Sequence, residues 1–169
     1  RDYLEIWRDV LVGVRSVPES LVLRDYHVDN LIRVSDRDGV AACALLDFQD
    51  AVKGPVTYDL VSLIEDARRD VSPSIVESVK ARYLNAFPGL DPDEFARSMA
   101  VLGAQRHSKV IGIFTRLCVR DGKPEYLRHI PRVWRLLEAA CKHPVLHSVN
   151  NWLDKHIPME CRLVPVTKV

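Results

Sequence analysis

The sequence lacks the features that mark several large classes of protein. Its four cysteines form no Cys-x-x-Cys pair, and no histidine lies at zinc-finger spacing from them, which argues against a zinc module. No apolar run approaches the ~20 residues that cross a bilayer, and the N-terminal residues show no signal-peptide pattern. We therefore expect a cytoplasmic protein that has reduced, mostly buried thiols and does not insert into a membrane.

The sequence also lacks an excess of charge of one sign. Its 24 basic and 23 acidic residues nearly cancel, whereas proteins that bind nucleic acid usually carry a clustered basic excess. The proportions of hydrophobic (47%) and charged (28%) residues are those of a globular protein rather than a disordered one. A length of 169 residues suits one domain or one lobe of a larger enzyme, and we expect no nucleic-acid partner.

Glycine is scarce, and the seven glycines are isolated from one another. Neither a Gly-x-Gly-x-x-Gly segment nor a Walker A segment is therefore present. These two motifs bind phosphates through closely spaced backbone N–H groups. The chain itself thus carries no recognisable glycine-rich phosphate loop.

Apolar periodicity predicts an α+β fold that is mainly α, with five or six helices and a few short strands. Asp38-Gly39 is a good sequence for a hairpin turn between the second and third strands. Ser72-Pro73 and Asp91-Pro92 each place a capping residue before a proline, which predicts the start of a helix. The predicted helices cover residues 3–17 and 57–67, 73–86, a long segment from 92, a segment from 131 and 146–157, and the strands cover residues 21–23, 31–34 and 42–46.

Three polar residues on the loops of these strands form a pattern that is typical of phosphoryl transfer. Asp25 and Asn30 are separated by four residues between the first two strands, and Asp47 directly follows the third strand. Transfer to a hydroxyl needs an oriented carboxylate for the nucleophile and oxygen ligands for Mg²⁺. A lone loop aspartate is more often a turn former or a cap, so the prediction depends on the three residues together.

Three segments around these residues carry a resemblance to a known family. Arg24-Asp25-Tyr26-His27-Val28-Asp29-Asn30-Leu31, Leu45-Leu46-Asp47-Phe48-Gln49-Asp50-Ala51 and Thr57-Tyr58-Asp59-Leu60-Val61-Ser62-Leu63 resemble the C-terminal lobe of the aminoglycoside phosphotransferase family. That family has a protein-kinase-like fold. Within it, Arg-Asp-Tyr-His and Asp-Phe-Gln-Asp are most similar to the anomeric N-acetylmuramate/N-acetylglucosamine kinases of cell-wall recycling. The resemblance implies one catalytic lobe over residues 1–169 and an N-terminal nucleotide-binding lobe outside this chain.

The resemblance also implies roles for individual residues. Asp25 would be the catalytic base, and Asn30 and Asp47 would bind Mg²⁺ and thereby the nucleotide. Asp59 would support the catalytic loop by accepting backbone N–H bonds. ATP and Mg²⁺ are the expected cofactors. The expected acceptor is a small molecule with a hydroxyl group, an amino sugar first, with an aminoglycoside, choline or homoserine as alternatives.

Two positions depart from the family pattern. Leu23 stands two residues before Asp25, where many members have histidine; that position usually packs against its surroundings, so we expect little consequence. Gln49 stands after Phe48, where protein kinases have glycine, so we expect no kinase-like flipping of this segment.

Other polar residues near the site have two interpretations each. His27 could contact the substrate or bond its own turn, and Asp50 could meet substrate hydroxyls. Asp29 is interpreted as a solvated loop acid rather than a metal ligand. Arg106 lies on the apolar stripe of the long helix, where a guanidinium needs a carboxylate or carbonyl partner, and we favour a structural salt bridge over substrate binding. Gln105, His107 and Lys109 are interpreted as helix surface, and Arg68 and Arg69 as helix-end cations.

Two functional hypotheses follow, and a third is weaker. The first is an ATP-dependent small-molecule kinase. The second is a truncated, non-catalytic lobe with a binding role or no independent role, which would expose apolar surface around the strands and the first helix. A metal-dependent hydrolase built on the clustered acids and His27 is disfavoured, because His27 has no second histidine at His-x-x-x-His spacing and no adjacent aspartate. The histidine pair with that spacing, His143 and His147, lies far from these acids in the sequence.

Overall fold

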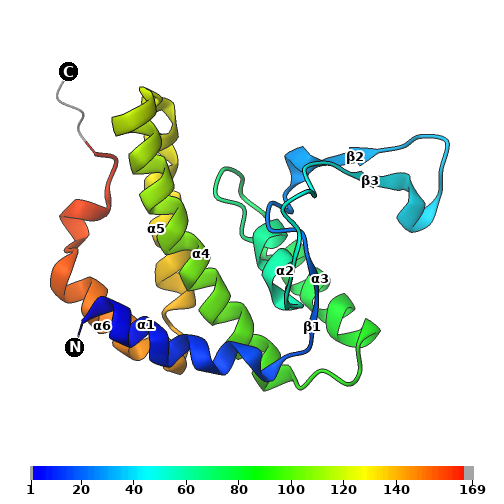
Figure 1. Cartoon of the computed structure of the whole chain (residues 1–169), viewed down its shortest axis with the longest axis horizontal. Helices are drawn as coiled ribbons and strands as arrows, with labels where there is room; N and C mark the ends of the chain where they lie inside the picture. The colour runs from blue at the N-terminus through cyan, green and yellow to red at the C-terminus, as the bar shows by residue number, and fades with distance from the viewer. Residues whose placement is uncertain (1, 166–169) are drawn as a thin grey trace.

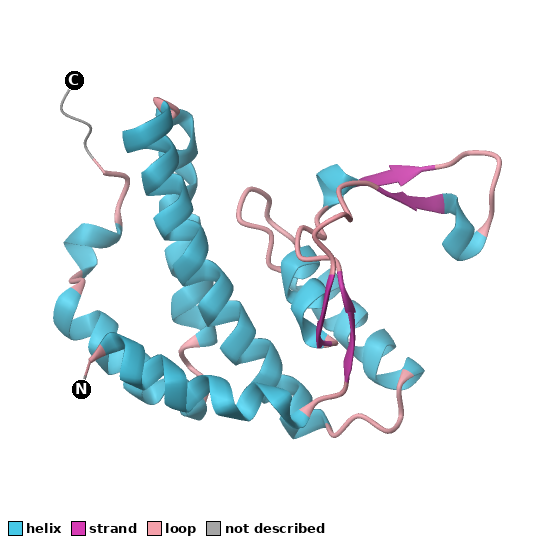
Figure 2. Cartoon of the chain, viewed as in Figure 1, coloured by secondary structure: helices cyan, strands magenta, loops and turns pink. Residues whose placement is uncertain are grey.

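The computed structural model describes residues 2–165 and shows a mainly helical chain with two small antiparallel sheets (Figures 1 and 2). The predicted fold class, α+β and mainly α, is confirmed. The helices are α1 (Tyr3–Val12), α2 (Thr57–Ile64), α3 (Pro73–Ala86), α4 (Pro92–Asp121), α5 (Ile130–Ala140) and α6 (His147–His156), and the strands are β1 (Glu19–Val22), β2 (Leu31–Arg33), β3 (Cys43–Leu45) and β4 (Val52–Pro55).

The 30-residue helix α4 organises the packing. Its central part contributes Val101, Leu102 and Ala104 to the larger hydrophobic core, which α1, α5 and α6 complete. Its first turns contribute Phe95 and Met99 to a smaller core shared with α2 and α3. One helix thus connects the helical bundle to the part of the chain that carries the strands (Figure 1).

The sequence places the starts of α3 and α4 correctly, because both depend on local caps. The Ser72 hydroxyl accepts a hydrogen bond from the Ile75 N–H at 3.4 Å. The Asp91 carboxylate accepts from the N–H groups of Asp93 (3.0 Å) and Glu94 (2.9 Å). Side-chain caps of this kind satisfy backbone donors that the first turn of a helix leaves free.

The sheets differ from the prediction in two respects. β1 pairs with β4, which the sequence did not predict because Val52-Lys53-Gly54-Pro55 shows little apolar alternation. β2 pairs with β3 as expected, but the predicted tight turn at Asp38-Gly39 is wrong. A hairpin turn of type I′ needs positive φ at both central residues, and φ is +60° at Gly39 but −115° at Asp38. Residues 34–42 instead form a longer connection that contains a 3₁₀ turn.

Two helices end earlier than the sequence suggests. α1 ends at Val12 and continues as a 3₁₀ turn over Gly13–Ser16. α2 ends at Ile64, which places residues 65–72 in a loop. No helix among residues 2–165 is long and apolar enough to cross a membrane.

The cysteines are less buried than the sequence analysis predicted. Cys141 is buried and Cys118 is half-buried, whereas Cys43 and Cys161 are exposed. Burial raises the pKa of the Cys141 thiol to about 11, since a thiolate is disfavoured away from water. At neutral pH this thiol is therefore protonated and a poor nucleophile.

We predict that iodoacetamide modifies the native protein at Cys43 and Cys161 and leaves Cys141 unmodified until the chain is unfolded in guanidinium. Mass spectrometry of digested samples taken over time would measure each rate. Labelling of Cys141 in the native protein at the rate of Cys43 would contradict the packing described for α5.

Candidate active site

The loop between β1 and β2 is held in place by one carboxylate. Asp59, in the first turn of α2, accepts hydrogen bonds from the backbone N–H groups of Leu23 (2.6 Å) and Arg24 (3.1 Å). Burial raises the pKa of Asp59 above its ordinary value, while the Leu23 and Arg24 N–H groups and the nearby Arg106 act to lower it. The N-terminal end of α2 thus fixes the backbone that precedes Asp25, the contact that the family resemblance implies.

A strained turn then directs Asp25 away from β1. The Asp25 N–H bonds to the Leu23 carbonyl at 2.9 Å, and the residue between them, Arg24, has φ of +71°. A positive φ is uncommon outside glycine and costs of order 1–3 kcal/mol, so the surrounding contacts must hold it. Those contacts are Asp59, described above, and the guanidinium of Arg106, which donates to the Arg24 carbonyl at 3.4 Å.

One side-chain and one backbone hydrogen bond bring the other two predicted residues into the same region. The Asn30 side-chain amide donates to the Asp25 carbonyl at 2.8 Å. The Leu46 N–H donates to the Asn30 carbonyl at 2.9 Å, which extends the β2–β3 ladder by one step and places Asp47 directly beyond it. Asp47, like Arg24, has a positive φ, +54°. The structure therefore brings Asp25, Asn30 and Asp47 together.

The donor atoms of Asn30 and Asp47 fit a magnesium ion. Because Asn30 uses its NH₂ group toward Asp25, its side-chain oxygen is available as a ligand. One oxygen of Asp47 accepts a bond from the Gln49 amide, and the other remains available. Residues 2–165 contain no group of three or more His, Cys, Asp or Glu that could hold a metal. Mg²⁺ usually takes one or two protein ligands and completes its shell with waters and substrate phosphates, so two oxygen donors suffice.

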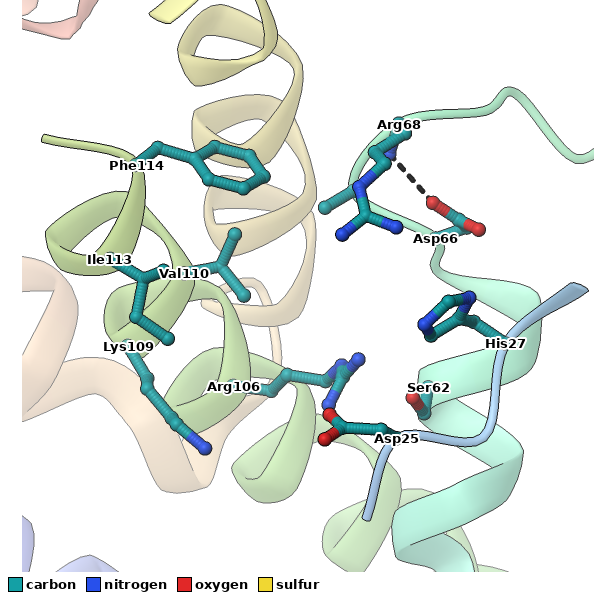
Figure 3. A pocket seen from close by; sticks show the side chains of 11 residues that line it. Asp25, His27, Ser62, Asp66, Arg68, Arg106, Lys109, Val110, Ile113 and Phe114 are labelled. Carbon is teal, nitrogen blue, oxygen red and sulfur yellow. Dashed lines mark hydrogen bonds between the residues drawn. The ribbon is translucent and has the colours of Figure 1, made fainter. Parts of the chain in front are cut away.

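A cavity of about 200 Å³ lies next to Asp25 (Figure 3). Asp25 and His27 reach it from the loop, and Ser62 and Asp66 reach it from α2 and the residues that follow. Its remaining lining comes mainly from α4 and consists of Arg106, Lys109, Val110, Ile113 and Phe114, with Ala67 and Arg68 beside Asp66. The space is small, polar at the Asp25 end and apolar along part of α4.

The structure separates the two loop residues whose roles the sequence left open. His27 lines the cavity, and its side chain is only 17% exposed. Asp50 is exposed and is not among the residues that line the cavity. A substrate in this cavity would therefore meet His27 rather than Asp50.

Asp29 is an exposed loop acid, as interpreted, and it also forms ion pairs with Arg68, at 3.5 Å, and with Arg69. The two arginines differ from their interpretation. Both arginines lie in the loop after α2 rather than at a helix end, because α2 stops at Ile64. These pairs connect the loop between β1 and β2 to the loop after α2.

Two residues of α4 also differ from their interpretation. The contact of Arg106 among residues 2–165 is the bond to the Arg24 carbonyl rather than the expected salt bridge. His107 is 1% exposed, not on the surface, and its Nε2 lies 2.7 Å from an oxygen of Glu65. Gly103 makes room for this pair, because a Cβ atom there would lie 3.0 Å from the same Glu65 oxygen.

The sequence analysis missed Ser62, Asp66, Arg68 and Lys109 as lining residues of the cavity. One signal was present: Lys109 follows Arg106 by three residues, and residues three or four apart share a helix face. Ser62 and Asp66 had no comparable signal, since their exposure to the cavity depends on how α2 packs.

The chain is similar to one family profile and to several known proteins. The profile of the phosphotransferase enzyme family (APH) matches residues 2–96. An N-acetylmuramate/N-acetylglucosamine kinase of Caulobacter vibrioides is 45% identical over 160 residues, which are 92% of this chain and 44% of that protein. Proteins of the same name from Pseudomonas aeruginosa (44% identical, 80% of this chain and 41% of that protein) and Neisseria meningitidis (45%, 82% and 43%) are also similar. The chain thus spans less than half the length of these curated relatives.

We predict that Asp59→Asn lowers the free energy of unfolding by about 1–3 kcal/mol, because an amide offers one acceptor oxygen and leaves one of the two backbone N–H groups unpaired. Urea denaturation would measure the loss, and hydrogen exchange should be faster at the Leu23 and Arg24 amides. Asp36→Asn, in the exposed connection between β2 and β3, is the matched control and should change neither quantity. Unaltered stability and protection in Asp59→Asn would show that this carboxylate does not hold the loop.

Proposed function

Because the chain belongs to the phosphotransferase enzyme family, we propose that it forms the catalytic and acceptor-binding part of an ATP-dependent kinase acting on a hydroxyl of an amino sugar. The observation that carries the proposal is the convergence of Asp25, Asn30 and Asp47, together with a small cavity that Asp25 lines. The names of the relatives support N-acetylmuramate or N-acetylglucosamine as the acceptor. The proposed site of the reaction is the cytoplasm, where ATP is available.

Asp25 is the proposed general base. Its carboxylate is exposed, lies at the polar end of the cavity and is aimed by the strained turn at Arg24. A hydroxyl of a molecule bound in the cavity can donate its hydrogen bond to this carboxylate, which orients the oxygen and accepts its proton during transfer. The supporting contacts from Asp59 and Arg106 keep the carboxylate in position.

Asn30 and Asp47 are the proposed metal ligands. When Mg²⁺ is bound, it offsets the negative charge of the phosphates. The side-chain amide of Asn30 links this part of the site to Asp25, because it also donates to the Asp25 carbonyl. The same residue therefore sets the spacing between the proposed base and the proposed metal ligands.

We assign the nucleotide-binding lobe to residues outside this chain. The curated relatives are more than twice as long as the segment that matches. Ile32, Leu45, Leu46 and Phe48, on and just after the β2–β3 hairpin, are exposed although apolar. Such a surface suits contact with a further lobe or with the adenine ring. The non-catalytic hypothesis expects the same surface, so only turnover separates the two.

We predict that Asp25→Asn lowers kcat of the whole protein at least ~100-fold, the usual contribution of a general base, and leaves KM for ATP within about threefold. A coupled assay with N-acetylmuramate and N-acetylglucosamine measures both constants. Asp38→Asn, an exposed acid before the 3₁₀ turn of the β2–β3 connection, is the control.

Aminoglycosides, choline and homoserine complete the acceptor panel. Transfer to one of them alone would correct the acceptor and keep the reaction. If no acceptor is phosphorylated in a way that depends on Asp25, the result contradicts the kinase hypothesis and favours the non-catalytic lobe.

A further inference from the structure

The cavity beside Asp25 is lined by three cationic side chains. Arg106 and Lys109 are one turn apart on the same face of α4, and Arg68 reaches the cavity from the loop after α2. Figure 3 shows these side chains around the space that Asp25 and His27 enter from the other side. Two carboxylates also line it, Asp25 and Asp66, so the cations are in excess by one charge.

Most of the donors of these cations have no partner among residues 2–165. Arg106 has one hydrogen bond, from Nη1 to the Arg24 carbonyl. Lys109 is exposed and has no hydrogen bond or ion pair with the described part of the chain. Arg68 is 3.5 Å from Asp29 and therefore partly neutralised. The unsatisfied positive charge is thus concentrated on the α4 side of the cavity.

Buried polar atoms of the same lining also lack partners. Ser62 is fully buried and Asp66 is 6% exposed, and the Ser62 hydroxyl and one Asp66 oxygen have no hydrogen bond within residues 2–165. The other Asp66 oxygen accepts from the Arg68 N–H at 2.7 Å. The His27 Nδ1 atom is likewise without a hydrogen bond. Buried polar groups are normally paired, so these atoms indicate a ligand that brings hydroxyl or amide groups.

We propose that Lys109 and Arg106 are specificity-determining residues of this cavity, which recognise the carboxylate of an amino-sugar acceptor. The inference rests on the proposed kinase function. Guanidinium and ammonium groups form charge-assisted hydrogen bonds with carboxylates, which are stronger than bonds between neutral groups. Ser62 and Asp66 bind the hydroxyl or amide groups of the sugar, and the apolar wall at Val110 and Ile113 accommodates its methyl groups.

N-acetylmuramate, which carries a lactyl carboxylate, and N-acetylglucosamine, which does not, form a matched pair of acceptors for the test. In the whole protein, Lys109→Met should raise KM for N-acetylmuramate by about tenfold or more and change KM for N-acetylglucosamine by less than about twofold. Arg106→Gln also weakens the support of the Arg24 turn, so it should lower kcat for both acceptors and, in addition, raise KM for N-acetylmuramate more than KM for N-acetylglucosamine. Lys142→Met, an exposed lysine outside the cavity, is the control and should leave both acceptors unaffected. Thermal unfolding of each variant verifies folding.

Three outcomes overturn the proposal. An equal loss on both acceptors together with a raised KM for ATP would assign Lys109 and Arg106 to the transferred phosphate. Unchanged kinetics in both variants would show that neither Lys109 nor Arg106 recognises the carboxylate. If the wild-type protein phosphorylates neither sugar, the kinase proposal fails. Calorimetry of sugar binding then tests whether Lys109 and Arg106 recognise the carboxylate. Binding of N-acetylmuramate that is no tighter than binding of N-acetylglucosamine, or that Lys109→Met does not weaken, overturns it there.

Discussion

The pair of hydrogen bonds that Asp59 accepts from the backbone N–H groups of Leu23 and Arg24 is the contact on which the site depends. Through these bonds the position of α2 determines the position of the loop between β1 and β2. The helix, α2, is in turn fixed against α4, because the Thr57 hydroxyl bonds to the Ser98 hydroxyl at 2.6 Å in the interior. The orientation of Asp25 therefore follows from the packing of the helical core.

The two halves of the site have different support. The proposed acceptor half, with the cavity and its cations, lies on α4, whose Phe114 both lines the cavity and belongs to the main core. The half with the proposed metal ligands lies at the base of the β2–β3 hairpin, which contains no buried residue. In Figure 1 this hairpin extends away from the helices. We infer that the acceptor half is formed by this chain alone, whereas the metal half gains further contacts from the nucleotide and the proposed lobe.

Local sequence signals predict the parts of the structure that depend on local chemistry. The caps at Ser72 and Asp91 fix the starts of α3 and α4, and the spacing of Asp25, Asn30 and Asp47 places three residues that the structure brings together. These features involve residues that are near one another in the chain or follow a family pattern.

The features that the sequence does not reveal depend on distant contacts. β4 forms because β1 is available to pair with it, and Gly54 lies against Val22. Asp29 finds Arg68 and Arg69 some 40 residues later only because α2 stops at Ile64. Ser62 and Lys109 become cavity residues through the packing of α2 against α4.

The proposed site is tested most directly by a crystal structure of the complete protein with Mg²⁺, a non-hydrolysable ATP analogue and N-acetylmuramate. We expect an acceptor hydroxyl within hydrogen-bonding distance of Asp25, Mg²⁺ on Asn30 and Asp47, and the sugar carboxylate on the α4 side of the cavity. A sugar bound elsewhere, or a metal that contacts neither Asn30 nor Asp47, would contradict it.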